Sequence, residues 1–116
     1  MSTVQRYMFV IDDLPRARGE SHELSFQGDS PESFADLFQQ ALREPTLWRR
    51  WLAMQPDPDA VDPSLGASDP NATVIAQQSD IHVSVEVRTT LPHAIIQHRL
   101  TLLVGRHWTL RDVSAG

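Results

Sequence analysis

Residues 81–88 read IHVSVEVR, and the fold is decided here more than at any other place in the chain. Apolar side chains alternate strictly with polar ones, which is the period-two pattern of a β-strand with one buried face and one solvated face. The valines therefore point to a core. Because His82, Glu86 and Arg88 fall on the other face, one side of the predicted sheet should stay open to water.

The segments around this strand predict an antiparallel meander of three or four strands. Residues 73–77 are expected to form a strand that turns back at residues 79–80. Residues 94–104 are expected to form the next strand, because placing Val85 opposite His98 aligns the apolar residues of both segments. This register sets the predicted order of the C-terminal half.

The last hairpin and the N-terminal strands complete the predicted sheet. A three-residue loop at 105–107 keeps the apolar residues of the final strand on one face, whereas a two-residue loop would scatter them. Residues 7–11 (YMFVI) are a β-branched and aromatic run closed by a turn. Apolar alternation at residues 22–26 predicts a partner for that strand, so we expect an N-terminal hairpin.

Two helices are predicted in the middle of the chain. Ser30 is suited to cap a helix whose first residue is Pro31. One apolar stripe with i, i+3, i+4, i+7 and i+8 spacing follows: Phe34, Leu37, Phe38, Ala41 and Leu42. Pro45 ends this helix, and Thr46 is suited to cap a second, shorter helix that extends to about residue 54. Trp48 or Trp51 of this helix should pack on the sheet.

These elements predict a single α+β domain over residues 1–116, in which one or two helices pack on one face of an antiparallel sheet. Residues 55–71 contain four prolines and should form an irregular, exposed loop. Cysteine is absent, and no segment is apolar enough to span a membrane, so we expect a cytoplasmic protein without a membrane partner. The net charge of -5 makes nucleic acid an unlikely partner.

The polar face of the predicted sheet is the first candidate site. It is expected to bind a protein partner through guanidiniums that hold carboxylates or phosphates in a bidentate manner. An ordinary solvated sheet face, with Glu86 paired to Arg99 across two strands, is the alternative interpretation. The residues expected on this face are His82, Glu86, Arg88, Gln97, Arg99, Thr101, Thr109 and Arg111.

The acidic loop is the second candidate site, since Asp57, Asp59 and Asp62 lie within six positions. Their spacing does not match the twelve-residue calcium loop, which needs a central glycine and a terminal glutamate. We therefore expect no metal there and no cofactor elsewhere. The loop is interpreted as a solvated segment that moves or meets a partner.

No catalytic motif is present: the sequence lacks a phosphate-binding glycine loop, a nucleophile elbow and a zinc-ligand spacing. His98 is expected to point into the core, as a satisfied histidine or as the acid–base group of a pocket between helices and sheet. The leading hypothesis is a small non-catalytic bacterial regulator, inhibitor, adaptor or immunity-type protein. A small enzyme or ligand-binding domain around His98 is the alternative, and a homodimer through a sheet edge is possible.

Overall fold

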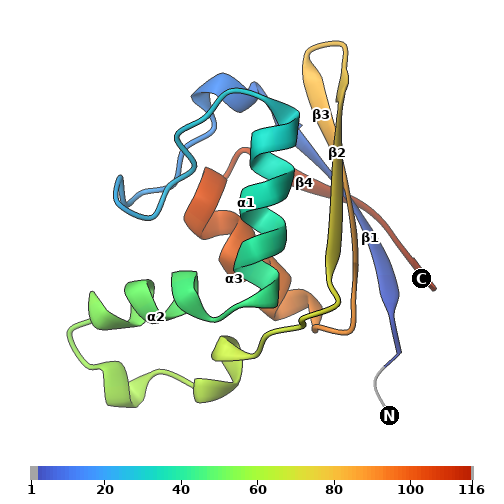
Figure 1. Ribbon diagram of the computed structural model, residues 1–116. Coiled ribbons are helices and arrows are strands. Elements are labelled where there is room, and N and C mark those ends of the chain that lie inside the picture. The colour runs from blue at the N-terminus through green and yellow to red at the C-terminus, as the bar shows by residue number, and fades with distance from the viewer. Residues whose placement is uncertain (1–2, 116) are drawn as a thin grey trace.

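A computed structural model describes residues 3–115 of the chain (Figure 1). Its helices and strands are β1 (Gln5–Asp12), α1 (Pro31–Arg43), α2 (Thr46–Ala53), β2 (Thr73–Ser79), β3 (His82–Thr89), α3 (His93–Val104) and β4 (Trp108–Ala115). Three short 3-10 turns accompany them: η1 (Leu14–Arg16), η2 (Pro58–Ala60) and η3 (Pro63–Gly66).

The strands form one antiparallel sheet in the order β2-β3-β1-β4. β1 and β2 run parallel to each other with β3 between them, and β3 and β4 run parallel with β1 between them. This is the split βαβ arrangement of ferredoxin-like folds, in which α1 and α3 serve as the crossovers. All helices lie on one side of the sheet (Figure 1). The predicted α+β class with an antiparallel sheet is confirmed.

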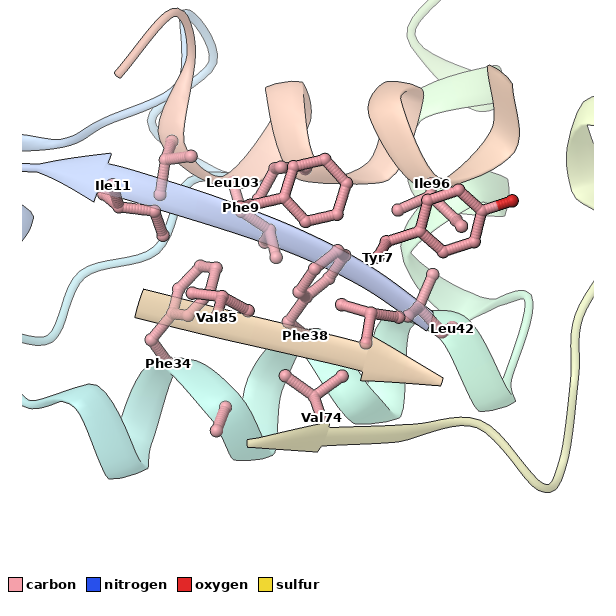
Figure 2. Close-up of a cluster of buried hydrophobic side chains, with 14 of the residues drawn as sticks. Tyr7, Phe9, Ile11, Phe34, Phe38, Leu42, Val74, Val85, Ile96 and Leu103 are labelled. Atoms are coloured by element: carbon pink, nitrogen blue, oxygen red, sulfur yellow. The ribbon is translucent and has the colours of Figure 1, made fainter. Parts of the chain in front are cut away.

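The core lies between β1, β3 and the two crossover helices. Tyr7, Phe9 and Ile11 of β1 point toward the helices, and the valines of β3 lie beside them in register. Phe34 and Phe38 of α1 pack against this layer (Figure 2). Strand alternation then turns residues 6, 8 and 10 to the opposite side, which no helix covers.

The prediction of a strand at residues 94–104 is wrong, because this segment is α3. Its buried positions are Ile95, Ile96, Arg99, Leu100, Leu103 and Val104, and this spacing is helical. Arg99 occupies a core position in this helix. When arginine is assumed to face solvent, the helical stripe is interrupted, and the remaining apolar residues fit the period-two alternation of a strand. Consequently β4 pairs with β1, and the predicted C-terminal meander and its last hairpin are also wrong.

The predicted N-terminal hairpin is wrong as well. Residues 21–25 form a turn in which the amides of Leu24 and Ser25 donate to Ser21 O. The Phe26 amide then donates to Leu103 O at the end of α3. Leu24 and Phe26 are buried, as their apolar character indicates. The backbone amide of Phe26, however, is paired with the end of a helix and not with a neighbouring strand.

Other predicted elements are confirmed. Ser30 accepts the Ser33 amide as the N-cap of α1, with Pro31 at the first position. α2 and the β2–β3 hairpin also lie where the sequence indicates. Thr46 is the first residue of α2 and not its cap, since Pro45 holds the N-cap position and no side chain caps this helix. Neither tryptophan of α2 packs on the sheet, however: Trp48 lies against Gly66, and the ring of Trp51 meets His98 edge-on at 4.5 Å.

Candidate functional site

The uncovered side of the sheet, called here the open face, carries part of the predicted arginine surface. His82, Glu86 and Arg88 of β3 lie on it, as the alternation of residues 81–88 indicates. Arg99 does not, because it is fully buried in α3. Arg111 is exposed on β4 at the bulge where the register with β1 shifts. The predicted Glu86–Arg99 pair is therefore wrong.

A residue that the sequence prediction missed, Arg6, completes the charged group of the open face. Arg6 of β1 lies directly opposite Arg88 of β3. Its Nε donates to Glu86 Oε1, while Arg88 Nε lies 3.4 Å from Glu86 Oε2. The predicted strand covers residues 7–11 and so does not include Arg6, whereas β1 begins at Gln5.

Two arginines thus share a single carboxylate. Like charges directly opposite each other on neighbouring strands are unfavourable, and one glutamate neutralises only one of them. The side chain of Arg88 is 53% exposed and that of Arg6 36%, so both guanidiniums reach water. The trio of Arg6, Glu86 and Arg88 keeps one net positive charge and spare N–H donors.

An apolar strip adjoins this trio. Ile75 of β2 and Met8 of β1 lie on either side of Glu86 in the register of the sheet. Ile75 is 54% exposed, whereas Met8 and Val10 are half-buried. The remaining residues of the open face in these strands are polar: Thr73, Gln77, Ser79, Ser84, Thr109, Asp112 and Ser114, with Asp12 and His82 paired at one end.

The two edges of the sheet differ. On β2, the outward amide of Val74 donates to Gln39 Oε1, and Arg43 Nε donates to Ala72 O just before the strand. Side chains of α1 therefore occupy part of this edge. Pairing with a second copy stays a prediction, and β4 is the edge that it would use.

Arg99 holds the Pro/Asp-rich loop to the helices. Its guanidinium donates to Ala41 O near the end of α1 at 2.8 Å, and to Leu65 O and Ala67 O at 3.0 and 2.6 Å. The last carbonyls of a helix lack partners within it and carry the negative end of its dipole, which suits a cation. Burial lowers the pKa of Arg99 from its usual value.

The acidic loop is exposed at Asp57, Asp59 and Asp62, as predicted. Asp62 accepts the Ser64 amide at the start of η3, and this hydrogen bond lowers its pKa. Asp69, at the end of the loop, is buried. Burial raises its pKa, but hydrogen bonds led by that from Thr89 outweigh this effect and lower it.

His98 lies on α3, beside Trp51, and so not next to Val85. Burial, followed by the charge of Arg99, lowers its pKa, and its buried Nδ1 has no hydrogen-bond partner among the described residues. His98 is not among the residues that line four clefts of the described surface. These clefts therefore give no support to acid–base chemistry at His98.

Within residues 3–115, no group of three or more histidine or carboxylate side chains is placed to hold a metal ion. None of the helices described has both the length and the apolar composition of a membrane span. Comparison with protein-family models, with curated proteins and with solved structures gives no match.

Proposed function

We propose that this chain is a non-catalytic protein-binding domain, acting as a cytoplasmic regulator, inhibitor, adaptor or immunity-type protein of a bacterium. Its open face would hold a partner segment that presents a carboxylate next to an apolar side chain. The arrangement of Arg6 and Arg88 around one glutamate, beside the exposed Ile75, carries this proposal.

The chemistry of the trio supports an acidic partner. A carboxylate placed between Arg6 and Arg88 would neutralise the remaining charge and accept charge-assisted hydrogen bonds from donors that now face water. It would also relieve the repulsion between the two guanidiniums. Both arginines are anchored on central strands of the sheet, so little backbone freedom is lost on binding.

The apolar strip supports a protein as the occupant. Ile75, on the edge strand β2, faces away from the core, and covering it with a partner would remove apolar surface from water. RNA-binding sheets of this size stack bases on aromatic side chains. The open face of the described strands has no phenylalanine, tyrosine or tryptophan, which favours a protein over a nucleic acid.

Affinity capture from the native cell extract tests the proposal, with the intact chain compared with a variant that carries Arg6→Gln and Arg88→Gln. Arg16→Gln with Arg49→Gln is the matched control, because both residues are exposed and lie off the sheet. We expect one stoichiometric protein that the face variant loses and the control retains. Equal capture by all three baits, or no protein captured by the intact chain, would contradict the proposal.

A further inference from the structure

One surface cleft has a volume of about 710 Å³ and lies away from the open face, at the end of α3. Its walls come from residues 18–21, from the end of α2 and from the turn between α3 and β4. The segment that contains residues 18–21 runs close to the end of α3 (Figure 1). This volume falls within the range of small-molecule sites.

Two of the residues that line this cleft are glycines in close contact with backbone. Gly105 has a φ of +63°, and a Cβ added to it would lie 2.5 Å from Arg18 O. A Cβ on Gly19 would overlap Leu102 O. Only glycine allows the two segments to approach this closely. The close approach therefore fixes these two segments of the cleft lining relative to each other.

Its walls combine apolar side chains with a net positive charge, because two arginines and one glutamate line it. Trp51 and Leu102 are half-buried and Met54 is 49% exposed, so each keeps apolar surface that a ligand would cover. The charged groups are Arg18, Arg106 and Glu20, with His107 beside them. None of these four forms an ion pair with another described residue.

Arg18 is also fixed in place. Its guanidinium donates to Leu14 O, Ala17 O and Gly28 O and lies 5.5 Å from the ring centroid of Phe26. All these partners are neutral, and Arg18 forms no ion pair with another described residue. A charge held in this way attracts an anion with little further loss of side-chain entropy.

We infer that the cleft binds an amphipathic carboxylate, a small molecule whose apolar or aromatic tail packs on Trp51 and Met54 and whose carboxylate lies near Arg106 and Arg18. The inference is independent of the open face. The two surfaces share no residue, so either proposal can fail without the other.

Octanoate is a suitable probe, with octylammonium as a control of the same chain length and opposite charge. The backbone amide resonances of Gly19 and Gly105 report on the cleft, and that of Gly66, which lies under Trp48, serves as a reference. We expect the amide resonances of Gly19 and Gly105 to shift with octanoate concentration until they reach a plateau, and the resonance of Gly66 to stay unchanged. Octylammonium should bind more weakly, by about tenfold.

Variants locate the ligand's charge. Arg106→Gln should weaken octanoate by about tenfold, whereas Arg111→Gln, which removes an exposed arginine from β4, should not change its affinity. Met54→Glu should weaken octanoate and strengthen octylammonium. Equal binding of the two probes, shifts that do not saturate, or an Arg106→Gln variant that binds octanoate normally would each overturn the inference.

Discussion

The guanidinium of Arg99 is held by backbone carbonyls from α1 and from the loop at residues 55–71, and no described carboxylate neutralises it. The terminal nitrogens Nη1 and Nη2 donate to these carbonyls, whereas the buried Nε has no hydrogen-bond partner among the described residues. Removing the guanidinium would leave the carbonyls unpaired in turn. Arg99 thus holds the loop against α1 and α3, and it stabilises the fold by keeping the loop in this position.

Arg99→Met should destabilise the fold by about 3 kcal/mol, because methionine keeps the apolar stem but leaves three carbonyls without donors. Arg111→Met, at an exposed position on β4, should change the free energy of unfolding by at most about 0.5 kcal/mol. Urea unfolding of both variants measures the difference. Equal midpoints would show that the buried contacts of Arg99 contribute nothing to stability.

At the scale of single elements, residues 94–104 can be interpreted as a strand or as a helix, and the two differ in which leucines they bury. A strand at 94–104 would turn Leu102 inward and Leu103 outward, whereas the helix buries Leu103 fully and leaves Leu102 half-buried. Both patterns are compatible with the apolar residues of this segment. The residue that distinguishes them is Arg99, since a helix needs it in the core.

Leu103→Ala should therefore destabilise the chain by about 3 kcal/mol, through lost apolar burial and a residual cavity. Leu102→Ala should cost about 1 kcal/mol or less, because that side chain is already partly in water. Thermal or urea unfolding of the two variants gives their order. A larger loss for Leu102→Ala would favour the strand and would contradict α3.

At the scale of the whole molecule, local patterns predicted the elements better than their arrangement. β1, α1, α2 and the β2–β3 hairpin follow from periodicity, capping and turn residues. The pairing of β1 with both β3 and β4 joins segments that are far apart in the sequence. It requires α3 as the connection between β3 and β4, and the sequence predicted a strand at residues 94–104 in its place. For this reason the sequence predicts only part of the arginine surface. The place of Arg88 follows from the alternation within β3, whereas the place of Arg6 beside it depends on the pairing of β1 with β3.

The central claim is that the open face meets a partner, and site-specific photo-crosslinking tests it most directly. A photoreactive residue replaces Ile75 on the open face or, as the control, Leu37 on α1, which is 37% exposed on the other side of the sheet. In native cells we predict one discrete adduct from position 75 that disappears when Arg6→Gln and Arg88→Gln are added. No adduct from position 75, or the same adduct from position 37, would contradict the account.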